Sequence, residues 1–244
     1  MTREVAAYRG LPFFPHSFVT IFTKYVPNPR LFSLKSDSIP RATIQRLALY
    51  VQVLEDLQRE GADVISSESL AKACDVNPSQ IRKDLAYFGK FGVRGVGYYI
   101  QDLIASLKRC LGIDHTWKTV LVGVGNLGRA LLNHKEFKLR GFEVIGAFDC
   151  DPFKIGEEVS GLEVMCTKRL MEKSHELGVE IGIITTPPER AQRAANHLVE
   201  AGIKGILNFA PARITVPEHV VLEYVDFFHH LYSVAFNITL SQQK

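Results

Sequence analysis

The sequence Val120-Leu121-Val122-Gly123-Val124-Gly125-Asn126-Leu127-Gly128 predicts a strand, a tight turn and the first turn of a helix. Its glycines fit the pattern G-x-G-x-x-G. The first permits the tight turn, the second lets the backbone approach a pyrophosphate, and the third allows the helix to pack closely on the strand. The amino end of such a helix offers N–H groups and a positive dipole to phosphate oxygens. We therefore expect a dinucleotide site formed by Gly123, Val124, Gly125, Asn126, Leu127 and Gly128.

An acidic residue follows the glycines at the expected distance. The next predicted strand ends at Asp149, about twenty residues beyond Gly128, where an acid binds the adenosine ribose hydroxyls. Neither Cys150 nor Asp151 is basic, so a ribose 2′-phosphate should be repelled, which favours NAD(H) over NADP(H). Two alternatives stay open. The domain could bind coenzyme A through a similar turn, or the glycines could serve packing alone while Asp149 caps the next turn.

Strands and helices alternate through the C-terminal half of the chain, which predicts a parallel sheet covered on both faces, as in a Rossmann domain. The final apolar segment, from Phe227 to Leu240, leaves no polar stripe, so a helix there needs burial on nearly every side. The predicted strands cover 119–124, 144–149, 181–185, 205–209 and 220–225, and the predicted helices between them cover 127–138, 168–176 and 189–201.

The preceding segment, from residue 38 to about 110, predicts a winged helix-turn-helix. Asn77 and Pro78 mark the start of its recognition helix, and Gln80 is placed to reach back to the cap. Residues 89–99 alternate glycine with bulky or basic side chains, which is typical of a β-hairpin. The other predicted helices are an amphipathic one with Ile44, Leu47, Val51, Leu54 and Leu57 on its apolar stripe, ending at Gly61, a short one over 67–74 with Ser66 as its N-cap, and one over 101–110.

Basic and polar side chains of this segment form a candidate DNA surface. Residues near the start of a recognition helix reach base edges and phosphates, and a wing contacts the adjacent backbone. Residues 82–94 carry four cations against one acid, Asp84. The alternative is an ordinary solvated helix face followed by a glycine-rich loop. The expected DNA contacts are Ser79, Gln80, Arg82 and Lys83 on the helix and Lys90 and Arg94 on the wing.

The composition excludes several other classes of protein. The net charge is +3, but residues 1–36 hold five of the 29 cations, so a polyanion can be bound only through a local patch. The four cysteines form no C-x-x-C pair and no zinc spacing, so we expect no metal. No apolar run reaches the ~18 residues that span a bilayer. An NAD-dependent enzyme is disfavoured, because too little chain remains for a substrate domain and no Tyr is followed four residues later by Lys.

These segments together resemble the Rex family of bacterial redox-sensing transcriptional repressors. The similarity is collinear and covers both predicted domains. The motifs that carry it are Ser38-Ile39-Pro40-Arg41-Ala42-Thr43, Gln80-Ile81-Arg82-Lys83-Asp84-Leu85, Tyr87-Phe88-Gly89-Lys90-Phe91-Gly92, Gly95-Val96-Gly97-Tyr98, Gly123–Gly128, Gly202-Ile203-Lys204-Gly205-Ile206-Leu207-Asn208-Phe209-Ala210-Pro211 and Val225-Asp226-Phe227.

The resemblance implies a cytoplasmic homodimer that binds a palindromic DNA operator when NADH is scarce and releases it when NADH binds. NAD⁺ would compete without causing release. The C-terminal helix would be exchanged between subunits, although the residue pattern alone also allows a helix packed on its own domain. The resemblance also implies an allosteric switch in which Asp226, followed by Phe227, contacts a basic group of the winged domain in one state only. Lys83 is the candidate partner.

We thus expect an α/β chain of four parts. Residues 1–37 are an extension, either disordered or the product of a start codon assigned too far upstream, with a basic DNA-binding arm as the alternative. Residues 38–115 form the winged helix-turn-helix, 116–226 the Rossmann domain that binds NADH or NAD⁺, and 227–244 the C-terminal swapped helix.

Overall fold

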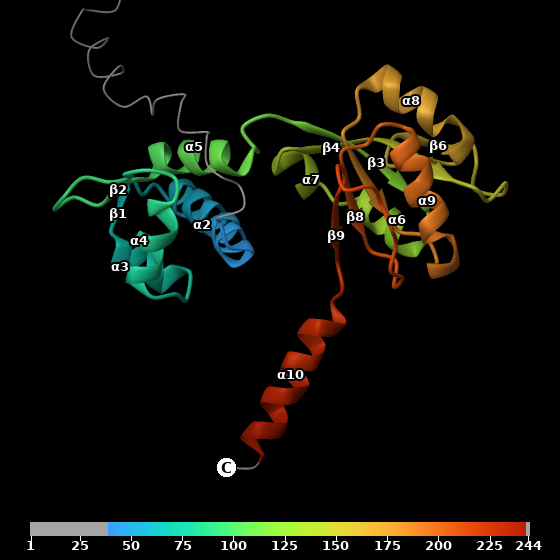
Figure 1. Cartoon of the computed structure of the whole chain (residues 1–244). Helices are drawn as coiled ribbons and strands as arrows, with labels where there is room; N and C mark the ends of the chain where they lie inside the picture. Colours follow the sequence, from blue (N-terminus) through green and yellow to red (C-terminus); the bar gives the residue numbers. More distant parts are fainter. Residues whose placement is uncertain (1–38, 243–244) are drawn as a thin grey trace, which may run out of the picture. The chain divides into compact units, whose positions relative to one another are not determined.

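The computed structural model describes residues 39–242, which form two compact units with the boundary between Leu111 and Gly112 (Figure 1). The expectations for residues 1–37 lie outside the described residues. Within the described part, no helix is both long enough and apolar enough to cross a membrane.

The first unit is built on the long helix α2 (Arg41–Arg59), which buries Leu47, Val51 and Leu54 as predicted. Ile44 was expected on the same stripe, but 45% of it is exposed. Thr43 and Tyr50 are buried instead, because both hydroxyls face the carboxylate of Asp84. The remaining elements of this unit are β1 (Val64–Ile65), α3 (Ser67–Ala73), α4 (Pro78–Ala86), β2 (Tyr98–Tyr99) and α5 (Ile100–Leu111).

Helices α3 and α4 form the helix-turn-helix. Ser66 caps α3 by accepting a hydrogen bond from the Ser69 N–H at 3.0 Å. In the turn, Asp75 takes a left-handed conformation (φ +52°), which Asp tolerates better than most side chains. Asn77 caps α4 by accepting from the Ser79 N–H at 2.8 Å. The reciprocal bond expected of Gln80 is absent, because its side chain donates to Asp84 instead.

The predicted hairpin over residues 89–99 is smaller than expected. A single bridge joins Val93 to Gly97 and closes a wing whose tip carries Arg94. The strand that follows, β2, pairs antiparallel with β1, a partner that the hairpin prediction missed. Gly97 permits this pairing, because a Cβ there would lie 2.4 Å from the carbonyl oxygen of Ile65.

The second unit is a seven-stranded sheet in the order β5-β6-β4-β3-β7-β8-β9. All neighbours are parallel except β5, which runs antiparallel to β6 at the edge. Without β5, the order is that of a Rossmann fold, with β3 as its first strand. The strands are β3 (Trp117–Val122), β4 (Phe142–Asp149), β5 (Glu158–Val159), β6 (Leu162–Cys166), β7 (Ile181–Ile184), β8 (Gly205–Asn208) and β9 (Val221–Tyr224).

The helices of this unit are α6 (Asn126–Leu132), α7 (Glu136–Leu139), α8 (Leu170–Leu177), α9 (Pro188–Glu200) and α10 (Phe228–Ser241), with a 3₁₀ turn η3 (Thr167–Arg169) before α8. The single helix predicted over 127–138 is therefore wrong. It breaks into α6 and α7 after Asn133, whose side chain donates back to the Arg129 carbonyl at 2.8 Å. Strands β5 and β6 were not expected from the sequence.

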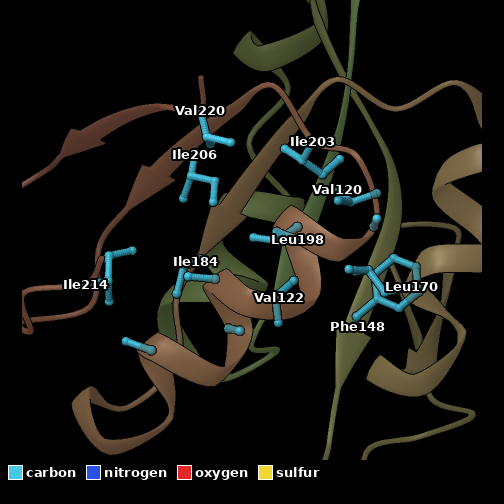
Figure 2. Packing of buried hydrophobic residues seen from close by; sticks show 14 of the residues in the cluster. Val120, Val122, Phe148, Leu170, Ile184, Leu198, Ile203, Ile206, Ile214 and Val220 are labelled. Carbon is cyan, nitrogen blue, oxygen red and sulfur yellow. The ribbon is translucent and has the colours of Figure 1, made fainter. Parts of the chain in front are cut away.

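Alternate residues of each strand fill two apolar layers. On one face, Val120 and Val122 of β3 pack with Phe148 of β4 and Leu198 of α9, and Figure 2 shows these side chains filling the space between helix and sheet. On the other face, Leu121 of β3 packs with Leu132 of α6. The end of β3 is thus packed on both faces, by α9 on one side and α6 on the other, and the glycine turn follows directly from it.

Candidate nucleotide and DNA sites

The glycine turn lies where the strand order reverses. Strand β3 has β4 on one side and β7 on the other, and α6 begins directly after the turn. In open parallel sheets, ligands bind at the carboxyl ends of the strands beside such a switch point. The predicted residues 123–128 are therefore brought to the position that a dinucleotide occupies in this fold.

Each of the three glycines fits the role assigned to it. Gly123 has a left-handed φ of +105°, and a Cβ there would lie 2.7 Å from the Thr186 nitrogen. A Cβ at Gly128 would lie 2.2 Å from the Gly123 carbonyl oxygen, so only glycine lets α6 pack this closely on β3. A Cβ at Gly125 would meet nothing within 4 Å. The backbone at Gly125 therefore faces open space, which a pyrophosphate could approach.

Two threonines that follow β7 complete the turn, and neither was expected from the sequence. Thr185 donates from its hydroxyl to the Gly123 carbonyl oxygen at 2.7 Å and so ties β7 to the turn. The hydroxyl oxygen of Thr186 is buried and has no hydrogen-bond partner among the described residues. A buried hydroxyl without a partner costs free energy, so a ligand that supplied one here would be stabilised. The turn therefore fits the dinucleotide that the fold implies.

Asp149 closes the turn from the end of β4. It is 5% exposed, and its Oδ2 accepts from the Val124 N–H at 2.8 Å. Its Oδ1 accepts from the N–H groups of Cys150 and Asp151 at 2.8 and 2.9 Å. Burial alone would raise the pKa of Asp149, but the hydrogen bonds from the Asp151 and Val124 N–H groups, together with the nearby Lys154 ammonium, hold the pKa below its usual value. The carboxylate is thus ionised and already clamps the turn.

A lysine completes the environment of Asp149. Lys154 Nζ lies 3.2 Å from Asp149 Oδ2 and is the only side chain with a polar contact to that carboxylate in the described part of the chain. Arg190, in the first turn of α9, places Nη1 3.2 Å from Cys150 Sγ. The prediction that a 2′-phosphate is repelled rested on Cys150 and Asp151, neither of which is basic. Lys154 and Arg190, which the structure brings to this end of β4, were not anticipated from the sequence.

The candidate DNA surface comprises α4 and the wing. Ser79, Arg82, Lys83, Lys90 and Arg94 are all exposed. Arg82 lies 3.3 Å from Glu68 Oε1 and donates to the hydroxyls of Ser67 and Ser79. Lys83 forms no ion pair within residues 39–242. It can therefore bind a phosphate without breaking an ion pair, whereas Arg82 must leave Glu68.

The one acid of the segment 82–94 does not weaken this surface. Asp84 is 0% exposed, and Arg46 of α2 holds it with two hydrogen bonds of 2.6 and 2.7 Å. Tyr50 and Gln80 donate to the same carboxylate, each at 2.8 Å. Because the charge of Asp84 is buried and compensated, the solvent-facing part of 82–94 carries cations alone.

The same cluster changes the role of Gln80. One N–H of its side-chain amide donates to Asp84, so Oε1 and the second N–H are left to meet DNA. Burial alone would raise the pKa of Asp84, but the bonds from Arg46, Tyr50 and Gln80 outweigh it and lower the pKa. Burial and the neighbouring Asp84 carboxylate raise the pKa of Tyr50, which therefore stays protonated and keeps donating.

The predicted switch residues lie at the start of α10. Asp226 Oδ1 accepts from the Phe228 N–H at 2.9 Å, and Phe227 stacks on Phe228 with ring centroids 4.7 Å apart. All residues from Val225 to Gln242 are exposed. The large apolar side chains of α10 are 46–67% exposed, which is unusual for a helix of this composition. No group of three possible metal ligands occurs in residues 39–242.

Two family profiles match the chain. Residues 38–86 match the family described as "Putative DNA-binding protein N-terminus", and residues 114–212 match the family described as "CoA binding domain". Among curated proteins, a redox-sensing transcriptional repressor Rex of Solidesulfovibrio magneticus is 68% identical over 211 residues, covering 86% of this chain and 96% of that protein. A protein of the same name from Maridesulfovibrio salexigens is 70% identical over 206 residues, covering 84% and 99%.

The chain is also similar to solved structures of a repressor of the same family. A crystal structure of RSP in complex with beta-NAD⁺ and operator DNA matches with a TM-score of 0.79 and 37% identity, over 84% of this chain and 94% of that one. The structure of RSP in complex with beta-NADH matches with a TM-score of 0.77 and 35% identity, over 84% and 97%. RSP is described as a Rex-family repressor.

Proposed function

Because the chain belongs to the Rex family of redox-sensing transcriptional repressors, we propose that it couples the binding of NADH at the turn after β3 to the release of operator DNA from α4 and the wing. It is a repressor and not an enzyme, and NADH and NAD⁺ are its allosteric ligands. The observation that carries the proposal is that one chain holds both a recognition helix with exposed cations and a glycine turn that fits a dinucleotide.

The DNA contacts follow from exposure and charge. Lys83 and Arg82 on α4 reach phosphates or base edges, with Ser79 beside them at the start of the helix. Lys90 and Arg94 contact the backbone from the wing, because Arg94 lies at its tip. Gln80 can contribute through Oε1 and through the second N–H of its amide, since one N–H already donates to Asp84.

The nucleotide contacts follow from the turn. The backbone of Gly125, Asn126 and Leu127 faces the pyrophosphate, and Asp149 binds the adenosine ribose. NADH acts as a signal, and its reduced nicotinamide is the group that the protein detects. The residues of the chain bind and orient the dinucleotide. Thr186 is placed to offer its buried hydroxyl to the ligand.

The assembled form is a homodimer that exchanges α10. Helix α10 has apolar side chains on every side, and none of them is buried. Covering this surface would stabilise the protein by roughly 25 cal/mol for each Å² of apolar surface removed from water. A second copy of the chain would cover it, as the resemblance to this family implies. A symmetric pair of recognition helices would then meet a palindromic operator.

The switch connects the two sites through Asp226, Phe227 and Lys83. Lys83 cannot pair with a DNA phosphate and with Asp226 at once, so a state in which Asp226 holds Lys83 competes with DNA binding. NADH would favour that state, whereas NAD⁺ would occupy the same turn without favouring it. Since the protein acts on operator DNA, we place it in the cytoplasm.

A second ligand has one observation in its favour, which is the match of residues 114–212 to "CoA binding domain". Titration of the purified full chain with NADH, NAD⁺ and coenzyme A, in the presence of labelled operator, separates the two. We expect NADH to release the operator and NAD⁺ to occupy the site without release. Release by coenzyme A, with no response to NADH, would overturn the proposal.

A further inference from the structure

Two cations flank the point where a dinucleotide presents its adenosine ribose. Lys154 Nζ lies 3.2 Å from Asp149 Oδ2 and 4.0 Å from Asp151 Oδ2. Arg190 reaches the same end of β4 from α9, through its contact with Cys150. The two side chains come from different elements, a loop after β4 and the first turn of α9, yet both contact residues 149–151.

The carboxylate of Asp149 has little capacity left for a ribose. Oδ1 accepts two backbone N–H groups, and Oδ2 accepts one backbone N–H and Lys154. A carboxylate oxygen has about two lone-pair positions, so both oxygens are filled. The contact with Lys154 is the one that a ribose hydroxyl can replace without breaking the turn.

The charge balance at this place also concerns the 2′-phosphate that distinguishes NADPH from NADH. Asp149 and Asp151 repel a phosphate, whereas Lys154 and Arg190 are the side chains that bind phosphates by charge-assisted hydrogen bonds. As long as Asp149 is present, it holds Lys154 and its own charge opposes the phosphate. Without Asp149, the two cations would be available.

We propose that Asp149 and the pair Lys154–Arg190 together set the preference for NADH over NADPH. On this view, the cations that an NADPH site needs are already in place, and Asp149, which holds Lys154 at 3.2 Å, is the main group that keeps them from binding a phosphate. The proposal rests on nucleotide binding at this turn, which is part of the proposed function. It adds the residues that determine specificity. It also attributes the preference for NADH to the carboxylate of Asp149 rather than to a lack of basic residues directly after it.

The test measures the affinities of the full-length protein for NADH and NADPH by nucleotide fluorescence. The variants are Asp149→Ser, Asp149→Ser with Lys154→Met, and Asp149→Ser with Arg190→Met. In Asp149→Ser we expect weaker NADH binding and NADPH binding at least about tenfold tighter than in the parent, since one strong charge-assisted contact is worth about that factor. Each double variant should lose the gain for NADPH and keep the NADH affinity of Asp149→Ser.

A matched control is Asp149→Ser with Lys204→Met. Lys204 precedes β8, so it lies at the opposite edge of the parallel sheet, where it pairs with Glu180. This variant should keep the gain for NADPH. The NADPH affinity of Asp149→Ser should also fall more steeply with salt than its NADH affinity, because the added contacts are ionic.

Three outcomes would overturn the inference. NADPH affinity in a folded Asp149→Ser could stay at the parent value, the double variants could keep the gain, or the Lys204→Met control could lose it. Thermal melting of each variant establishes that it is folded, and Asp149→Asn replaces Asp149→Ser should the latter fail to fold. A parent protein that binds no NADH at all would contradict the proposed function instead, so the two failures are distinguishable.

Discussion

Arg46 and Asp84 form a two-point ion pair between α2 and the recognition helix α4. Arg46 Nε donates to Asp84 Oδ2 at 2.6 Å, and Nη2 donates to Oδ1 at 2.7 Å. Asp84 is fully buried, and Tyr50, Gln80 and Thr43 donate to it as well. The recognition helix is therefore held against α2 by a satisfied polar cluster in addition to its apolar residues.

Substitution of Asp84 should lower the stability of the first unit. Asp84→Ala leaves the Arg46 guanidinium and the Tyr50 hydroxyl without their shared acceptor, which should cost about 3 kcal/mol. Urea unfolding monitored by circular dichroism measures this loss. Asp56→Ala is the matched control, because Asp56 pairs with Arg59 at an exposed position and its loss should cost at most about 0.5 kcal/mol. Equal losses in the two variants would contradict the role of the cluster.

The contribution of Asp84 should also depend on pH in a defined direction. Its pKa is lowered in the folded protein, so the stability it confers is fully present above the unfolded value of about 3.9. That stability is lost as the pH falls through the folded pKa. The gap in unfolding free energy between the parent and Asp84→Ala should therefore be constant from neutral pH to about 4 and should close below it. A gap that closed between pH 5 and 8 would argue against this assignment.

Removal of Lys83 should weaken operator binding and flatten its salt dependence. One lost phosphate contact reduces the slope of log K against log salt by about 0.9. Arg82→Ala should have a smaller effect, because Arg82 must give up its contact with Glu68 to reach DNA. Gel shifts across salt concentrations measure both. Lys108→Ala, which removes a lysine of α5 paired with Glu55, should leave the slope unchanged. An unchanged slope in Lys83→Ala would remove Lys83 from the DNA surface.

Loss of the Asp226 charge should uncouple NADH from DNA. Asp226→Asn keeps an oxygen that can accept from the Phe228 N–H, so the start of α10 is preserved. We expect this variant to bind NADH and operator separately as the parent does. In the presence of both, release should require more NADH, with a coupling loss of about 1–3 kcal/mol or 5–150-fold. Parent-like release curves would exclude Asp226 from the switch.

Deletion of α10 should abolish self-association. A chain ending at Asp226 should elute from a sizing column with the mass of one subunit, whereas the full chain should elute with the mass of two. Phe236→Asp should act in the same direction, because it places a charge in an apolar helix. Gln242→Ala, at the exposed polar end, should not. A full chain that elutes with the mass of one subunit would contradict the exchanged helix.

Much of the fold could be predicted from local pattern. The glycine turn, the caps at Ser66 and Asn77, and the alternation of strands and helices depend on residues close in sequence, and the structure confirms them. The wing was predicted less well because β2 pairs with β1, whose paired residues lie 33 to 35 positions away in sequence, and no local pattern shows that choice.

The candidate sites could likewise be predicted only where their residues form a local sequence pattern. Residues 123–128 and Asp149 could be found because they follow a spaced motif. Thr186, Lys154 and Arg190 could not, since each is brought to the turn only by the packing of the sheet. Asp84 was counted as a surface acid because its partner Arg46 lies 38 residues earlier, on another helix.

The exposed helix α10 has a consequence for how the repressor is made in the cell. If a second copy covers it, as we propose, every newly synthesised chain carries an open apolar helix until a partner arrives. The amount of completed repressor then rises with the square of the concentration of free chains. At low abundance, the single chain is the species that chaperones and proteases encounter. Repression would therefore depend steeply on the rate of synthesis, independently of the redox state of the cell.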